Sequence, residues 1–400
     1  MSKQWLTRTQ YAVVMALLVS ALLVSAKSHG DTVRFHAWGG SAQVNGYLQW
    51  VAEQLEEQGI TLQHVKLADT SDAVSRVLAE KAGGNLSNGS VDLIWINGEN
   101  FAAMKKHGLL QPNWVSSLPN FALTNPSINP AMVTDFGEPT QGMEAPWGKA
   151  SMVFYYRENH LSNAKVAPPT TIAELLAFAE ALPGRFTYPL PNDYLGISFL
   201  KYAAVALNPK HRDVFYKPVS QQALRTITPS LWAYLDKLHP LMWRQGEYMV
   251  RQASQLQRLV DAGELALSFS FTAAEIPSAV ERFDLPPDIR TYAMQDGSLA
   301  NVHFIGIVFN SPHKETAKQV VNFMLSPLAQ SQKKKLAVWG DDTVLDIALL
   351  NVEQQALFTS NETHPSAIPP DSSSPLIAEP HSSWSDALRQ VWFERYGARY

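Results

Sequence analysis

A tryptophan and two glycines follow a β-prone segment near the start of the chain. The segment is 32–38, and Trp38, Gly39 and Gly40 stand at its end. Glycines let a ligand approach the backbone closely, and the helix expected after Ser41 would present free N–H groups suited to an anion. A tight strand-to-helix turn around a core tryptophan explains the same residues equally well. We therefore treat these three residues as ligand-binding candidates with a structural alternative.

A second group of polar residues follows another apolar segment. Asn97, Glu99 and Asn100 come directly after segment 91–96, which reads as a buried strand. In open α/β sheets the loops at the carboxyl ends of the strands line the ligand crevice. We therefore favour a binding role for this group.

Further candidates lie after predicted strands or where the chain is expected to pass between two lobes. They are Trp147, Tyr188, Asp193, Ser270 and Asn301. Trp147 and Asn301 could instead pack a hinge, and the others could belong to the core. His303 lies two residues after Asn301 and shares its two alternatives.

Catalytic and metal motifs are missing from the sequence. It contains no Gly-x-Ser-x-Gly, His-Glu-x-x-His, Walker or dinucleotide-binding pattern. Its eleven histidines are dispersed, so we predict neither a metal site nor a cofactor, and the absence of cysteine excludes disulfides and thiolate chemistry. A lyase or hydrolase that uses Glu99 or Asp193 with His303 remains the alternative, because catalytic residues can meet only in space.

The elements that would position these candidates alternate between strands and helices. Segments 32–38, 60–67 and 91–96 read as strands separated by helices, which indicates an α/β lobe with a largely parallel sheet. Later strands are expected at 150–156, 186–190, 265–271 and 304–309. A chain of this length favours two lobes over a single core.

The first residues have the order of an export signal. Lys3 and Arg8 precede the apolar run 12–24, and small residues end at Ala26, so we predict a cleaved signal peptide at 1–26. The run is shorter than the roughly twenty residues needed to span a bilayer. The net charge of −4 is scattered along the chain, so no nucleic-acid partner is expected.

Several segments, taken in order, resemble the family 1 extracellular solute-binding proteins of ABC importers. They are Val91–Ile96, Ala145–Gly148, Pro168–Leu175 and Phe304–Ile307. Within that family the chain is similar to the YnjB-type branch, a sibling of the thiamine, polyamine and iron binders.

The resemblance implies a type II periplasmic-binding-protein fold, in which two α/β lobes with two crossing segments close over a ligand cleft. It implies lobe one at 31–112 and 304–342, and lobe two at 113–303 and 343–400. It implies a monomeric, non-enzymatic periplasmic protein that captures a small solute and delivers it to an inner-membrane ABC permease. Aromatic residues together with Glu99 and Asp193 would suit an organic cation, whereas the N–H groups at Gly39 and Gly40 would suit an anion. We lean slightly to the cation.

Overall fold

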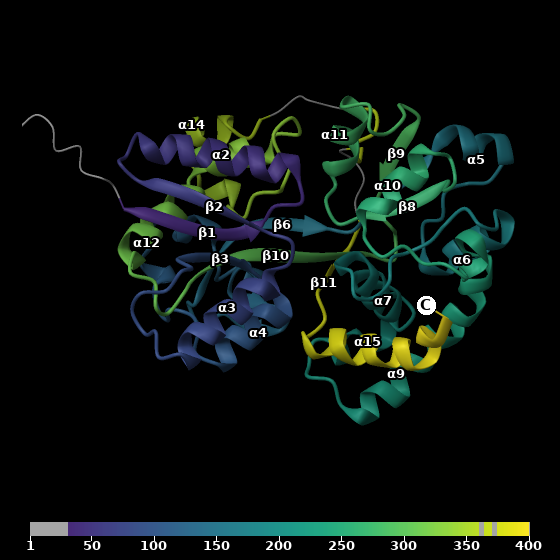
Figure 1. Ribbon diagram of the computed structural model, residues 1–400. Coiled ribbons are helices and arrows are strands. Elements are labelled where there is room, and N and C mark those ends of the chain that lie inside the picture. Colours follow the sequence, from purple (N-terminus) through teal and green to yellow (C-terminus); the bar gives the residue numbers. More distant parts are fainter. Residues whose placement is uncertain (1–30, 360–363, 370–373, 400) are drawn as a thin grey trace, which may run out of the picture.

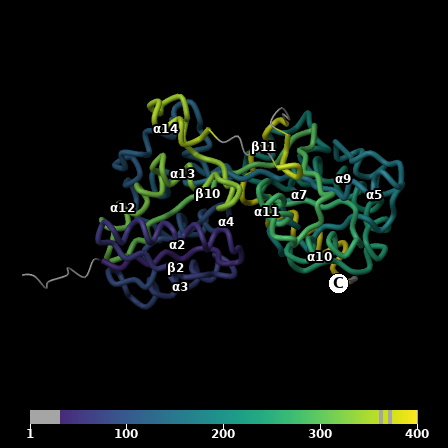
Figure 2. The backbone as a smooth tube through the Cα atoms, turned by 90° about the horizontal axis from the view of Figure 1, so that it is seen from above, coloured from purple at the N-terminus to yellow at the C-terminus, as the bar shows by residue number. Residues whose placement is uncertain are grey.

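The structure of the chain is a computed structural model that describes residues 31–359, 364–369 and 374–399 (Figure 1). Two bodies lie side by side and are joined by chain segments that pass between them (Figures 1 and 2). Each body has its own cluster of buried hydrophobic residues. The predicted signal peptide at 1–26 lies outside the described residues.

A six-stranded sheet forms the centre of lobe one, and its edge strand β11 comes from the part of the chain that packs with lobe two. Its order is β11-β10-β3-β1-β2, and β6 pairs with β10 as well. β1 is parallel to β2 and β3, whereas β10 is antiparallel to β3 and β6. The strands are β1 (Thr32–Trp38), β2 (Thr61–Leu67), β3 (Leu93–Ile96), β6 (Glu144–Ser151), β10 (Ser298–Ile307) and β11 (Leu376–Ala378). A short hairpin of β4 (Thr134–Asp135) and β5 (Glu138–Pro139) adds to this lobe.

Helices cover both faces of this sheet. Figure 1 shows α2 on one face and α3 and α4 on the opposite face. The helices of lobe one are α2 (Ala42–Glu56), α3 (Thr70–Ala82), α4 (Gly98–Lys106), α12 (Lys314–Met324), α13 (Pro327–Lys334) and α14 (Val352–Ala356). Helix α2 begins where the Ser41 side chain accepts a hydrogen bond from the N–H of Val44.

Lobe two has a smaller sheet surrounded by helices. Its order is β8-β7-β9, and both pairings are antiparallel. The strands are β7 (Val153–Arg157), β8 (Leu267–Ser270) and β9 (Ile289–Tyr292). The helices are α5 (Glu158–Ala164), α6 (Ile172–Ala181), α7 (Tyr194–Ala206), α8 (Arg212–Phe215), α9 (Gln221–Leu238), α10 (Ser254–Asp261), α11 (Glu275–Glu281) and α15 (Ser383–Tyr396).

The predicted strand 186–190 is a loop in the structure. Its backbone groups bond to other loops: the N–H of Trp243 donates to Phe186, and the N–H of Leu190 donates to Val250. Because no neighbouring strand takes these bonds, the segment does not join the sheet of lobe two. The predicted strand 150–156 is also different, since β6 ends at Ser151 and β7 starts at Val153.

Strands β6 and β10 run antiparallel to each other where the chain passes between the lobes. Their pairing extends from Ala300 with Ser151 to Gly306 with Glu144, and its register shifts between His303 and Phe304. The first residues of β10 also pair in parallel with β11. These two strands are therefore the hinge elements of the molecule.

The hydrophobic clusters divide the chain differently from the predicted lobe boundaries. Trp114, Met132 and Trp147 pack in the hydrophobic cluster of lobe one, although we expected residues 113–147 in lobe two. Leu345 and Leu350 also pack in the cluster of lobe one. Ile377 and Trp384 pack in the cluster of lobe two, so the chain passes between the lobes a third time. We propose the boundaries 31–148 and 302–358 for lobe one, and 152–299 and 376–399 for lobe two. Along the described ranges, no helix has the length and apolar character that crossing a membrane requires.

Candidate functional site

The two lobes contact each other on both sides of the hinge. The hydroxyl of Ser278 in α11 donates to the Leu336 carbonyl of lobe one at 2.9 Å. The guanidinium of Arg389 in α15 lies 3.4 Å from the carboxylate of Glu99 in α4. Helices α11 and α15 of lobe two therefore touch lobe one at this interlobe boundary.

Trp38, Gly39 and Gly40 form the turn between β1 and α2, at the carboxyl end of β1. The N–H of Gly39 donates to Leu67 at 3.0 Å, and a Cβ at Gly40 would lie 2.7 Å from the Trp38 ring. The ring therefore folds back over Gly40, and a side chain at this position would displace it. Trp38 nevertheless stays 43% exposed, so it is a turn residue that also offers an aromatic face to solvent.

Asn97, Glu99 and Asn100 lie at the start of α4 and are each partly buried. Asn97 occupies the N-cap position but makes no side-chain cap bond. The N–H of Gly98 donates instead to the carboxylate of Asp135 at 2.7 Å. The amide of Asn97 is thus free of a capping role, whereas Glu99 is engaged with Arg389 of the other lobe.

Aromatic rings gather where β3, β6 and β10 run side by side. The ring centroid of Trp147 lies 5.0 Å from that of Trp95 and 5.3 Å from that of Trp339. Trp147 is fully buried, so the structure gives it the hinge-packing role that was its alternative. Trp95 is only partly buried and is the member of this group that can present a face to a ligand.

His303 on β10 completes this group of rings. Its ring stacks on Trp339 at a centroid distance of 5.9 Å, and its Nε2 lies 2.9 Å from the Asp341 carboxylate. The fully buried ammonium of Lys333 pairs with the same carboxylate. Burial lowers the pKa of Lys333, and the Asp341 carboxylate opposes that shift.

Asn301 links the hinge to lobe two. Its Nδ2 donates to the hydroxyl of Tyr194, the first residue of α7, at 2.6 Å, and lies 3.4 Å from the Glu379 carboxylate. The ring of Tyr194 packs edge-on against Phe271 at 5.2 Å and is 43% exposed. Glu379 pairs with the buried ammonium of Lys201 at 2.6 Å. This network therefore ties β10, α7 and the end of β11 together.

The structure gives three candidates other roles. Tyr188 is fully buried and bonds to His239 and Trp392, because the segment around it is a core loop of lobe two. Asp193 caps α7, accepting from the N–H of Leu195 at 2.8 Å. Ser270 is buried, and its hydroxyl bonds to the Glu275 carboxylate.

Three buried carboxyl groups lie near this boundary. Burial raises the pKa values of Asp135, Glu144 and Glu379. Both carboxyl oxygens of Glu144 are buried without a hydrogen-bond partner, and one oxygen of Asp135 shares this state. Each of these carboxyl groups therefore favours its neutral form more than an exposed carboxyl does. Within the described residues, no cluster of histidine or acidic side chains is arranged to hold a metal ion.

Trp95, Tyr194 and Glu379 were not predicted from the sequence. Trp95 lies in β3, one residue before its end, so its place near the end of a strand resembles that of Trp38 and was a usable signal. Tyr194 follows Asp193 directly, and from the sequence we predicted the binding role for Asp193 instead. Glu379 had no local signal, because only the pairing of β11 with β10 brings it to the hinge.

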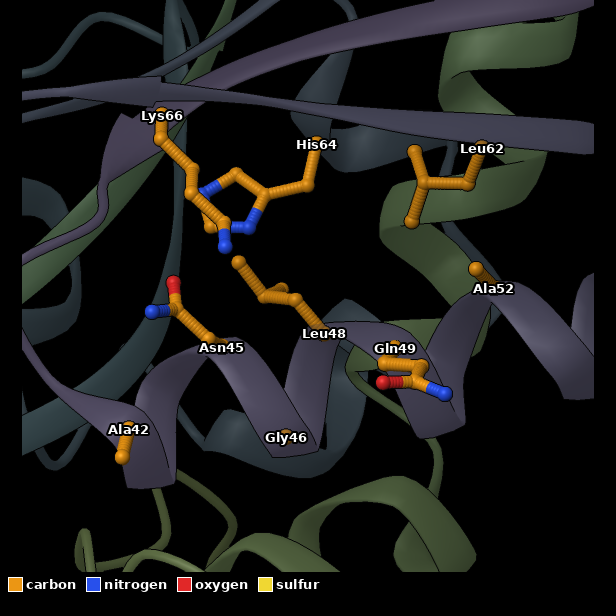
Figure 3. Close-up of a pocket in the computed structure, with 9 residues that line it drawn as sticks. All are labelled: Ala42, Asn45, Gly46, Leu48, Gln49, Ala52, Leu62, His64 and Lys66. Atoms are coloured by element: carbon orange, nitrogen blue, oxygen red, sulfur yellow. The ribbon is translucent and has the colours of Figure 1, made fainter.

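A hollow of about 550 Å³ lies away from the hinge, between α2 and β2 (Figure 3). Asn45 and Leu48 extend into it from the helix, and His64 and Lys66 extend from the strand (Figure 3). The His64 ring lies 3.3 Å from the Ala37 carbonyl. Lobe one alone forms this hollow, so a hinge movement would not close it.

Comparisons with known proteins show the family and the fold of the chain. The sequence profile of a family described as bacterial extracellular solute-binding protein matches residues 49–363. Protein YnjB from Escherichia coli (strain K12) is 40% identical over 375 residues, which cover 94% of this chain and 93% of that protein.

Solved structures show the same fold at low sequence identity. The periplasmic binding protein AfuA from Actinobacillus pleuropneumoniae, with fructose-6-phosphate bound, has a TM-score of 0.61 at 13% identity over 91% of this chain and 98% of that chain. The spermidine/putrescine ABC transporter substrate-binding protein PotD from Streptococcus pneumoniae has a TM-score of 0.62 at 15% identity, over 93% and 100%. The predicted type II periplasmic-binding-protein fold is therefore confirmed.

Proposed function

Because the chain belongs to the bacterial extracellular solute-binding proteins, we propose that it captures a small solute in the periplasm and delivers it to an inner-membrane ABC permease. The observation that carries the proposal is the arrangement of two separate cores on the hinge strands β6 and β10. A hinge of this kind lets two preformed walls close over a ligand.

The solute site that we propose lies at the interlobe boundary on the hinge. Three groups support this position because they come from both lobes and from β10: the partly exposed rings of Trp95 and Tyr194, and the amide of Asn301. Trp38, Asn97 and Asn100 would line the lobe-one side. Aromatic faces and amide groups bind flat or polar organic molecules without needing a metal.

We favour an organic cation as the solute. The tryptophan and tyrosine faces suit cation–π contact. Burial raises the pKa values of Glu379 and Asp135, and a positive ligand beside them would favour their ionised forms and pair with them. The solved relatives differ in what they are named for, a spermidine/putrescine transporter in one case and a bound sugar phosphate in the other. The fold is therefore compatible with a cationic or an anionic solute, and our preference for a cation rests on the side chains at the boundary.

No specific observation favours the lyase or hydrolase alternative. The acids that it would use have other roles, because Asp193 caps α7 and Glu99 faces Arg389. We therefore propose that the chain binds its solute without turnover.

A thermal-shift screen of residues 27–400 tests this function. The panel contains vitamins, polyamines, sugars, amino acids and oxyanions, and a specific solute should raise the Tm by mass action. Tyr194→Ala should abolish that rise. Tyr248→Ala is the matched control because Tyr248 is also exposed but lies in a loop of lobe two. No rise with any compound, together with consumption of one of them, would refute the proposal.

A further inference from the structure

We infer that His303 contacts the solute through a hydrogen bond that it accepts at Nδ1, and that Asp341 and Lys333 orient its ring for this purpose. The solute would then carry an N–H or O–H donor beside a flat or cationic part. This inference rests on the proposed function, since it names the chemistry of the same site.

The position of His303 places it beside the solute groups already described. It lies two residues from Asn301 on β10, so the two side chains share one face of that strand. Its ring centroid lies 5.3 Å from that of Trp95, the partly exposed tryptophan. A solute that touches Trp95 and Asn301 would therefore meet the edge of the His303 ring.

The partners of His303 fix which nitrogen is available. Asp341 accepts from Nε2, and the carboxylate is itself held by Lys333 in a fully buried ion pair. A neutral imidazole that donates from Nε2 carries its lone pair on Nδ1. Among the described residues, none bonds to Nδ1, and this atom is not one of their fully buried polar atoms. Nδ1 is thus an acceptor that the protein leaves unused.

The neighbouring strand is shaped for this arrangement. Gly148 on β6 pairs with His303, and a Cβ at this position would overlap both the Asp341 carboxylate and the His303 ring. Three tryptophan rings surround the imidazole, which restricts its rotation. A buried ion pair, an obligatory glycine and an aromatic wall together hold one side chain in one orientation.

Nitrogen NMR of the histidine-labelled chain tests the tautomer directly. We expect the His303 resonances, assigned with His303→Gln, to show a proton on Nε2 and an unprotonated Nδ1. On addition of the pooled solute panel described above, the Nδ1 resonance should move upfield as it accepts a hydrogen bond. A proton on Nδ1 in the free protein would overturn the inference.

Binding by two variants completes the test. His303→Gln retains a donor toward Asp341 but lacks the acceptor at Nδ1, so it should fold and lose at least fivefold in affinity for the pool component that shifts the wild-type Tm. His303→Asn places its amide near Nδ1 and should recover part of that loss, whereas His64→Gln in the hollow of Figure 3 should lose nothing. Unchanged binding by His303→Gln would overturn the inference and leave the proposed function standing. A wild-type chain that no pool component shifts, while one component is consumed, would overturn both.

Discussion

Glu144 is the residue whose environment most constrains its charge. Its carboxyl group is buried on β6, both oxygens lack a hydrogen-bond partner, and the Asp135 carboxyl lies near enough to repel a second negative charge. Burial and this repulsion raise the pKa of Glu144 well above its ordinary value of 4.5. Between the ordinary pKa and the raised folded-state pKa, the folded chain therefore holds a proton that an unfolded chain would release.

Glu144→Gln should remove this pH dependence. Below pH 4.5 the carboxyl is protonated in both states, and its full contribution to stability is present. As the pH rises toward the raised folded-state pKa, only the unfolded chain releases the proton, so stability falls. We expect the Tm of Glu144→Gln to equal that of the wild type at pH 4 and to exceed it at pH 7.5. Glu56→Gln, an exposed change on α2, should show no such difference, and a similar gain in both variants would contradict the assignment.

A substitution at Asp193 tests whether this residue stabilises the fold or binds the solute. Its carboxylate accepts from the N–H groups of Leu195 and Ala253, at 2.8 and 2.9 Å. Asp193→Ala should lower the free energy of unfolding by about 1 to 2 kcal/mol, the usual scale for a lost cap. Urea denaturation measures this, and Asp193→Asn should recover part of it. Solute affinity should stay unchanged; a loss of affinity at constant stability would return Asp193 to the site.

Residue roles were predictable where the local sequence carried the signal. Trp38–Gly40 form the turn after β1, and Asn301 lies on β10 where the chain passes between the lobes, as their positions in the sequence predicted. Trp147 and Tyr188 have the same local signature but are fully buried. Burial depends on what packs against a side chain from distant parts of the chain, which the spacing of residues does not reveal.

At the scale of elements, a buried ion pair joins α7 to the end of β11. Lys201 and Glu379 are almost fully buried and lie 2.6 Å apart. Lys201→Met leaves the Glu379 carboxylate buried without its partner, so we expect a loss of about 3 to 5 kcal/mol in unfolding free energy. The double variant Lys201→Met with Glu379→Leu should recover most of the loss in urea denaturation. A double variant as unstable as the single one would show that the charge pairing is not the cause.

The elements of lobe one were the more predictable ones. The stripe Val44, Tyr47, Leu48, Val51 and Leu55 recurs at helical spacing in the sequence, and all five residues are buried on α2. Lobe two lacks such regular alternation: the segment 186–190 has the composition of a strand but bonds to loops. Strand β11 pairs with β10 because the chain passes back from lobe one to lobe two before it. No local sequence pattern predicts this pairing.

At the scale of the whole molecule, the ion pair of Glu99 with Arg389 joins the two lobes. Both side chains are partly exposed, so the pair should contribute only about 0.2 to 1 kcal/mol. Glu99→Gln should shift the unliganded chain toward a more open form and increase its radius of gyration in small-angle scattering. Glu315→Gln breaks a pair within α12 and is the control. Equal radii for both variants would contradict a role of this pair in closure.

A crystal structure of residues 27–400 with the panel compound that raises the Tm most tests the central claim directly. The account predicts one bound molecule between the lobes on the hinge, in contact with Trp95, Tyr194 and Asn301, and near His303. A molecule bound only in the hollow of Figure 3, between α2 and β2, with the hinge groups untouched, would contradict it.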